Sequence, residues 1–234
     1  MKETILALIA SVISFFFPNR SPTPNITPPT PIPTVINQQG QPNYHLIETS
    51  FIPQAPEKKW DQPWQDACEE SALLTLYYHY QDQDPSLEQV KQDILDMVNY
   101  QAKNEMSKDV NLEQMKQISQ DYLNIQAKII DNPSLEDLKE QLLLNRPILV
   151  PTAGKKLFKE NKHFNNGGPY YHNIVILGYN DDQQKFIVHD VGTQFGAYFK
   201  YSYKLLLDAI HDFPPSLNKE DINQGQKKVL VLLK

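Results

Sequence analysis

The chain has 234 residues, 40% of them hydrophobic, which is enough for one sizeable domain or two small ones. Its net charge of -6 comes from 28 acidic and 22 basic residues that are spread along the chain rather than gathered in blocks. This distribution argues against a nucleic-acid-binding surface, whose affinity depends on clustered Lys and Arg facing phosphates.

The first 17 residues contain an apolar run, ILALIASVISFFF, that follows Lys2 and Glu3 and ends at Pro18. The run is shorter than the roughly 20 residues that a helix needs to cross a bilayer, and it matches the apolar part of a secretory signal. We therefore predict a signal peptide or an uncleaved signal anchor at 1–17; the alternative is a buried helix of the domain. The protein is expected outside the cytoplasm, secreted or held at the membrane by this segment alone.

Residues 18–43 are predicted to be a linker. Seven prolines occur between Pro18 and Pro33, and proline removes the backbone donors that helices and sheets require. An extended, semi-rigid spacer is the expected result. The globular pattern begins at Tyr44, so residues 44–234 are predicted to form one domain.

The domain opens with an extended stretch, HLIETSFIPQAP, and a turn-rich segment then leads to Cys68. After it, ESALLTLYYHYQ repeats apolar residues with the period of a helix, so Cys68 is expected at a helix N-terminus with Asp66 as the cap. Later segments predict helices at 87–100, 112–123, 135–144 and 201–211, and strands at 125–130, 146–152, 172–180, 185–192 and 228–234. Helices first and a mostly antiparallel sheet afterwards is an α+β layout.

Cys68 is the only cysteine, so it cannot close a disulfide within the chain. A free cysteine is commonly a small buried apolar residue, and that is the alternative to a reactive group. The helix N-terminus favours the reactive group, because a helix end and a nearby imidazolium both lower the pKa of a thiol. The imidazole has to come from a residue far along the chain.

His172 and Asp190 are the candidates for base and acid. His172 opens the apolar strand HNIVILGYN, and Asp190 ends the next strand, FIVHDVG, after the turn NDDQQ. An antiparallel hairpin brings the start of the first strand beside the end of the second, so the carboxylate would orient the imidazole and support its positive form. Taken singly, the histidine fits a surface position and the aspartate a turn.

Two stretches, FIPQAPEKKWDQPWQDACEESALL and YYHNIVILGYNDDQQKFIVHDVGT, resemble the nucleophile and base regions of bacterial papain-like cysteine peptidases. The most similar branch is that of the bacteriocin-processing (double-glycine leader) peptidases and their secreted relatives. The resemblance implies a papain-like α+β fold with Cys68 as nucleophile, His172 as base and Asp190 as orienting acid. Many members have glycine after the cysteine, where this chain has Glu69, and Asp190 precedes Val191 rather than proline.

The resemblance also implies an upstream glutamine as a second oxyanion donor, beside the backbone N–H of the cysteine. Such donors stabilise the negative charge of a tetrahedral intermediate. Gln54 matches the strand-ending position of the family and is favoured slightly, Gln62 matches the spacing usual in papain-like enzymes, and Gln65 is the third candidate. For each, a solvated turn residue is the alternative.

Aromatic residues flank both motifs. These aromatic residues are expected either to line a groove for an extended peptide or to pack in the core: Trp60, Trp64, Phe164, Tyr170 and Tyr171. Residues 155–171 lack periodicity and are predicted to be a binding loop or lid beside the catalytic histidine.

We therefore predict a thiol-dependent hydrolase that cleaves peptide or amide bonds through an acyl-enzyme on Cys68, with a peptide or protein substrate and no cofactor. The alternative is a catalytically inactive relative that binds peptides or acts as an interaction module at the cell surface. A metal site at His163, His172, His189 and Asp190 is disfavoured, because His189 and Asp190 point to opposite faces of a strand.

Overall fold

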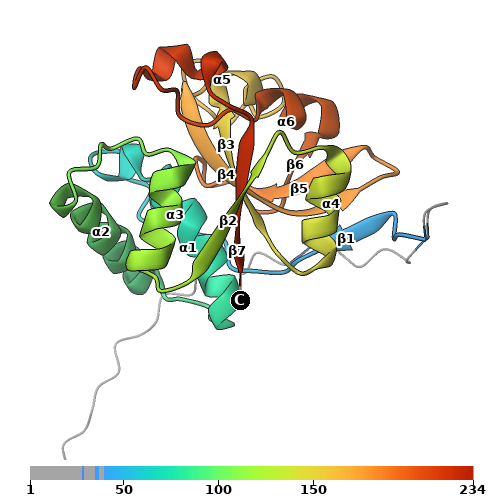
Figure 1. The fold of residues 1–234 in the computed structure, drawn as a ribbon, viewed down its shortest axis with the longest axis horizontal. Helices are drawn as coiled ribbons and strands as arrows, with labels where there is room; N and C mark the ends of the chain where they lie inside the picture. The colour runs from blue at the N-terminus through green and yellow to red at the C-terminus, as the bar shows by residue number, and fades with distance from the viewer. Residues whose placement is uncertain (1–27, 29–34, 37–39, 234) are drawn as a thin grey trace, which may run out of the picture.

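The structure, a computed structural model, describes residues 28, 35–36 and 40–233 (Figure 1). The strands are β1 Tyr44–Leu46, β2 Gln126–Asp131, β3 Ile148–Ala153, β4 Tyr171–Asn180, β5 Lys185–His189, β6 Phe199–Ser202 and β7 Lys228–Leu233. The α-helices are α1 Cys68–Gln81, α2 Leu87–Lys103, α3 Leu112–Asp121, α4 Leu135–Leu143, α5 Gly154–Leu157 and α6 Tyr203–Ala209, and the 3-10 helices are η1 Trp64–Asp66 and η2 Lys219–Gln224.

All these strands belong to one antiparallel sheet. Its order is β2-β7-β3-β4-β5-β6, and β1 pairs with the C-terminal end of β4. Strand β4 lies at the centre, between β3 on one side and β5 on the other, and every one of its residues is buried. The start of β4 is therefore a rigid support for whatever side chains it carries.

Each face of the sheet has its own hydrophobic core, and α1, α2 and α3 lie on one side of it while α4 and α6 lie on the other (Figure 1). In β4, Val175 and Leu177 pack with the first group of helices, and Ile174 and Ile176 with the second. Successive side chains of a strand point to opposite faces, which explains the alternation. Full burial of such a side chain contributes about 1.5–3 kcal/mol, so α1 is held firmly against β4.

Helices α2, α3 and α4 begin where polar side chains cap them. Ser86, Asn111 and Ser134 each accept a hydrogen bond from the backbone N–H of the residue three positions on. These caps satisfy backbone donors that have no partner inside the helix. The helix starts predicted at residues 87, 112 and 135 are therefore confirmed.

Helix α1 begins differently, and the predicted cap at Asp66 is wrong. The N-cap position is Ala67, which provides no side-chain hydrogen bond. Asp66 belongs to η1, and its carboxylate accepts a hydrogen bond of 2.7 Å from Gln62 Nε2. The chain enters α1 from a 3-10 turn, and that path directs the Asp66 side chain away from the first turn of the helix.

The predicted α+β layout is confirmed, but the helix predicted at 201–211 is a strand followed by a shorter helix. Strand β6 pairs with β5 over four positions, and α6 starts only at Tyr203, after the cap Ser202. Tyr201 is fully buried in the sheet, facing Phe186 in the register. Pairing with β5 therefore overrides the local helical pattern.

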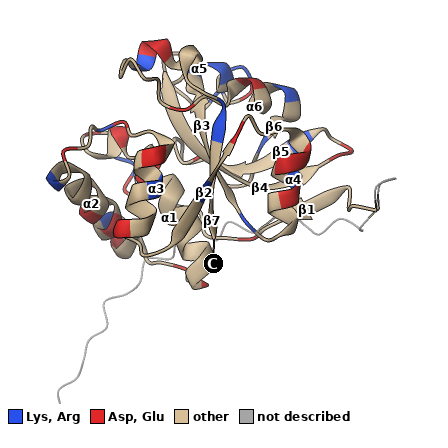
Figure 2. Cartoon of the chain, in the orientation of Figure 1, with Lys and Arg blue, Asp and Glu red and all other residues tan. Residues whose placement is uncertain are grey.

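The predicted signal or anchor at 1–17 and most of the linker predicted at 18–43 lie outside the described residues. Within the described part of the chain, no helix has both the length and the apolar character that a membrane crossing requires. Figure 2 shows both acidic and basic residues on α2, α3 and α4.

Candidate active site

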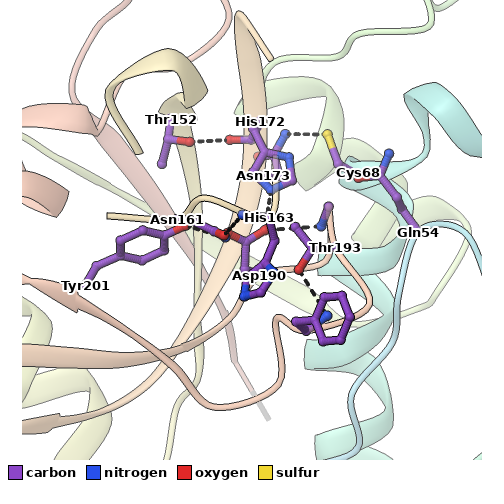
Figure 3. A network of polar contacts seen from close by, with 12 residues as sticks. Gln54, Cys68, Thr152, Asn161, His163, His172, Asn173, Asp190, Thr193 and Tyr201 are labelled. Atoms are coloured by element: carbon purple, nitrogen blue, oxygen red, sulfur yellow. Dashed lines mark hydrogen bonds and ion pairs between the residues drawn. The ribbon is translucent and has the colours of Figure 1, made fainter. Parts of the chain in front are cut away.

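Cys68 is the first residue of α1, and the packing of α1 on β4 fixes its position. The cysteine side chain faces the sheet and is only 6% exposed. Figure 3 shows Cys68 and Asn173 of β4 pointing toward one another. The nucleophile candidate therefore lies between the head of the helix and the start of the central strand.

The hairpin of β4 and β5 brings His172 and Asp190 together. The two strands pair from Asn180 and Lys185 back to Val175 and His189, with a register shift between Ile176 and Gly178. His172 Nε2 lies 2.8 Å from Asp190 Oδ1. This is the contact that the antiparallel hairpin predicts, and it joins two side chains that are almost completely buried.

The second oxygen of Asp190 has two further partners that the sequence did not suggest. Asn161 Nδ2 and the Tyr201 hydroxyl donate to Oδ2 at 2.9 and 2.5 Å (Figure 3). Burial alone raises the pKa of Asp190, but His172 and these two donors outweigh it and hold that pKa below its ordinary value. Asp190 is therefore a stable carboxylate opposite the imidazole.

The sulfur of Cys68 forms hydrogen bonds with residues other than His172 in this conformation. Among the described residues, its hydrogen-bond partners are Glu69 Oε2 at 3.0 Å and Asn173 Nδ2 at 3.8 Å. Burial raises the pKa of the Cys68 thiol well above its usual value, and Glu69 raises it further, while Asn173 lowers it. The net result is a raised thiol pKa, whereas the helix end alone was expected to lower it.

Gln54 is buried close to the nucleophile helix, but its amide nitrogen is already engaged. Nε2 donates to the carbonyls of Trp64 and Gln65 at 3.0 and 3.1 Å, while Oε1 is buried without a hydrogen-bond partner among the described residues. The Gln54 backbone N–H donates to Val191 O at 3.0 Å, which ties this segment to the loop after Asp190. Side chains at the other two candidate positions, Gln62 and Gln65, are exposed.

The site is closed by the irregular segment predicted as a loop or lid. Phe164 packs edge-on against the His172 ring at 5.3 Å between centroids, and His172 is almost completely buried. Of the flanking aromatic residues, Phe164 and Tyr171 are buried, whereas Trp60 and Tyr170 are exposed. Phe164 therefore helps to shield the His172 ring from solvent.

Gly192 has no side chain, and the His172 imidazole occupies the space that a Cβ atom at this position would need. A Cβ atom at this position would lie 2.5 Å from His172 Cε1 and 2.9 Å from Nε2. Its backbone N–H also donates to Asp190 Oδ1 at 3.2 Å. The glycine after Val191 therefore helps to position the His172 imidazole, which the sequence did not reveal.

A groove of about 1390 Å³ lies elsewhere, at the C-terminal end of α1, and is lined by residues such as Tyr78, Tyr80 and Tyr198. None of Cys68, His172 or Asp190 lines it. Within the described residues, no three His, Cys, Asp or Glu side chains come together as a metal-ligand set.

A cysteine at the head of a helix, opposite a buried histidine and aspartate on an antiparallel sheet, is the architecture of a papain-like cysteine peptidase. The chain belongs to the Peptidase_C39 like family, whose model matches residues 46–210. The crystal structure of a candidate C39-like peptidase from Bacillus anthracis aligns with 82% of this chain and 98% of its own, with a TM-score of 0.51 and 15% identity, which shows a shared fold. A comparison with curated proteins finds no match.

Proposed function

We propose that this protein is a thiol-dependent hydrolase that cleaves peptide or amide bonds outside the cytoplasm through an acyl-enzyme on Cys68. The observation that carries the proposal is the buried His172–Asp190 pair at the start of the strand against which the cysteine helix packs. Membership of a family of C39-like peptidases supports the same class of chemistry.

In the first half of the reaction, the S–H bond of Cys68 turns from Glu69 toward the imidazole, while the sulfur stays beside the Glu69 carboxyl group. Because Nε2 of His172 is hydrogen-bonded to Asp190, the thiol proton passes to Nδ1 of the same ring. The sulfur then bonds to the carbonyl carbon, and the carbonyl oxygen becomes an oxyanion. The backbone N–H of Cys68, at the helix end, is placed to donate to that oxygen.

In the second half, the imidazolium returns its proton to the leaving nitrogen as the C–N bond breaks, and a thioester remains on the cysteine. His172 then takes a proton from water, whose oxygen attacks the thioester carbon and releases the acid and the thiol. Asp190 holds one tautomer of the ring and stabilises its positive form throughout.

The location outside the cytoplasm is supported by the sequence before Tyr44. The apolar run within residues 1–17 and the proline-rich segment after it have the order of a secretory signal followed by a spacer. Fractionation of cells that produce the full chain tests this point: recovery in the medium or the membrane fraction is expected, and recovery only in the cytosol would contradict it.

One observation favours a second function: the Cys68 thiol is buried and forms a hydrogen bond with Glu69. Cys68 is nearly inaccessible and bonded to Glu69, as expected for an inactive relative that binds peptides without cutting them. The two functions differ in their thiol chemistry. A catalytic thiolate reacts rapidly with iodoacetamide near neutral pH, whereas an inert buried thiol does not.

The decisive experiment compares the wild type with Cys68→Ala on a peptide library, with the exposed Ser216→Ala as a matched control. Cys68→Ala is expected to lose all turnover, Ser216→Ala to keep it, and wild type to yield an acyl-enzyme visible by mass spectrometry. Equal turnover by the wild type and Cys68→Ala would reject the proposal.

A further inference from the structure

The residue after the nucleophile is in direct contact with the reacting atom. Glu69 Oε2 lies 3.0 Å from Cys68 Sγ, and Glu69 Oε1 accepts a hydrogen bond of 3.3 Å from the backbone N–H of Val110. The Glu69 side chain is 1% exposed, although it occupies the first turn of a helix, where carboxylates usually face water. The charge of a buried carboxyl group in contact with the sulfur affects the ionisation of the thiol.

Two acids in contact and out of water can carry at most one negative charge between them. A thiolate and a carboxylate 3.0 Å apart would repel strongly in a poorly solvated site. Three states remain: both groups protonated, a thiolate beside a carboxylic acid, and a thiol beside a carboxylate. Only the second contains the nucleophile, and it requires the proton to be on Glu69.

The surroundings of Glu69 favour its neutral form. Burial first, then the charges of Glu70 on α1 and Asp109 before α3, raise the pKa of Glu69 well above its ordinary value. From β4, the buried Tyr171 faces the same region and adds no positive charge. Burial and the acidic neighbours outweigh the hydrogen bonds that stabilise the carboxylate, among them those from the Cys68 thiol and the Val110 N–H.

The other charged groups nearby act on different partners. Lys108 and Lys219 lower the pKa of Asp109. Asp212, after α6, accepts hydrogen bonds from the backbone N–H groups of Leu112 and Phe213. The proton on Glu69 is therefore set mainly by burial and by the acidic groups beside it.

We propose that Glu69 is a proton-controlled latch on Cys68: its neutral carboxyl group donates to the sulfur and permits a thiolate, and its ionised form holds the thiol proton and silences the nucleophile. This inference rests on the proposed nucleophilic role of Cys68. With Glu69 neutral, His172 takes the thiol proton and the carboxyl O–H stabilises the sulfur. With Glu69 ionised, the same step would create two adjacent negative charges.

Glutamine at position 69 separates the two forms, because its amide can donate to the sulfur and cannot ionise. The test measures the rate at which iodoacetamide alkylates Cys68, a step in which the S–C bond forms, iodide leaves and the thiol proton passes to the base. The profile is recorded from acidic to alkaline pH for wild type, Glu69→Gln and the exposed Glu140→Gln as the matched control.

At alkaline pH, Glu69→Gln should react at least about tenfold faster than the wild type, the effect of one unit of thiol pKa, and the two rates should converge at acidic pH. Glu140→Gln should follow the wild type. A Glu70→Gln variant removes a like charge beside Glu69, so the loss of reactivity should begin at a lower pH. A purely structural role for Glu69 would move none of these profiles.

The outcomes separate this inference from the proposed function. If wild type and Glu69→Gln both react and their profiles coincide, the latch is wrong and the nucleophile stands. If neither reacts at any pH, both proposals fail. Should Glu69→Gln not fold, infrared spectra of Glu70→Gln decide: a protonated-carboxyl band that disappears as reactivity is lost supports the latch, and its absence at neutral pH overturns it.

Discussion

His172 Nε2 and Asp190 Oδ1 are joined by a hydrogen bond of 2.8 Å, and neither residue is more than 2% exposed. His172 lies in β4 and Asp190 directly follows β5, so the hairpin of these two strands sets the geometry of the pair. A carboxylate that is already fixed and desolvated orients the imidazole without further ordering, which is what a general base requires.

The Asp190→Asn variant tests that pair. An amide cannot provide the negative charge that supports the imidazolium, and it can present an N–H to the ring and select the wrong tautomer. We expect kcat to fall by about 10²- to 10⁴-fold, the usual contribution of general acid-base catalysis. The measurement is peptide turnover at the optimal pH, with circular dichroism as a check on folding. Turnover within a factor of three of wild type would contradict the role.

Tyr201→Phe should act on the same carboxylate more weakly. The variant removes the 2.5 Å hydrogen bond to Asp190 Oδ2 and leaves that from Asn161 in place. The pKa of Asp190, which is held below its ordinary value in the wild type, should rise. A lowered acid pKa stabilises the fold above the unfolded pKa, and this stability is lost as pH falls through the folded pKa. The variant should therefore lose activity and stability at a higher pH than wild type.

The matched control for Tyr201→Phe is Tyr198→Phe, which removes a hydroxyl that donates to Thr49 O at 3.1 Å instead of to Asp190. Profiles of kcat against pH for the two variants and the wild type give the comparison. An acidic limb that stays in place in Tyr201→Phe would show that the tyrosine does not tune the acid.

Periodicity in the sequence was sufficient for the elements that carry the candidate triad. The apolar alternation of β4 and β5 and the helical stripe after Cys68 are properties of contiguous residues, so those elements could be predicted locally. Strand β6 could not, because a four-residue strand is fixed by its partner β5 rather than by its own pattern.

The residues that surround the candidate triad could not be predicted from the periodicity of the sequence. Asn161 and Gly192 reach Asp190 and His172 through the path of irregular segments, which has no period. Glu69 is buried by the packing of α1 against β4 and by the loop before α3, which no local pattern indicates. Asn173 contacts the sulfur because it lies on the face of β4 that α1 covers.

Glu70→Gln should change how stability depends on pH. Burial raises the pKa of Glu70 from 4.5 to about 7 in the folded protein, so the fold prefers its neutral form. The stability that this preference provides is complete below the unfolded pKa and is lost as pH rises through about 7. The amide remains neutral, so the variant should gain on the order of 3 kcal/mol relative to wild type across this range.

Urea unfolding at a series of pH values measures the effect of Glu70→Gln. Glu140→Gln, with an exposed carboxylate, should track the wild type throughout. A constant difference between Glu70→Gln and wild type at every pH would mean that the buried carboxyl group does not titrate in this range.

Gly192→Ala should displace the base while leaving most of the fold intact. The added methyl group would lie 2.5 Å from His172 Cε1, so the ring or the loop has to shift. A displacement of about 1 Å at a reacting group can cost about 100-fold in rate, which is the loss of kcat expected here. Gly167→Ala is the control, since its methyl group meets open space, although its φ of 80° carries some strain. Equal kcat values for the two variants would show that the glycine does not position the imidazole.

Gln54→Ala, compared with Gln62→Ala and Gln65→Ala, identifies the side-chain oxyanion donor. Removal of one such donor typically costs about 10²- to 10³-fold in kcat with little change in KM. Gln54 Nε2 is bonded to the carbonyls of Trp64 and Gln65 in the resting site, so it has to turn from them when a substrate binds. The loss is expected at Gln54 alone, because Gln62 and Gln65 are exposed. Thermal unfolding separates this effect from loosening of the loop, and a kcat that falls only in Gln62→Ala would move the donor to that residue.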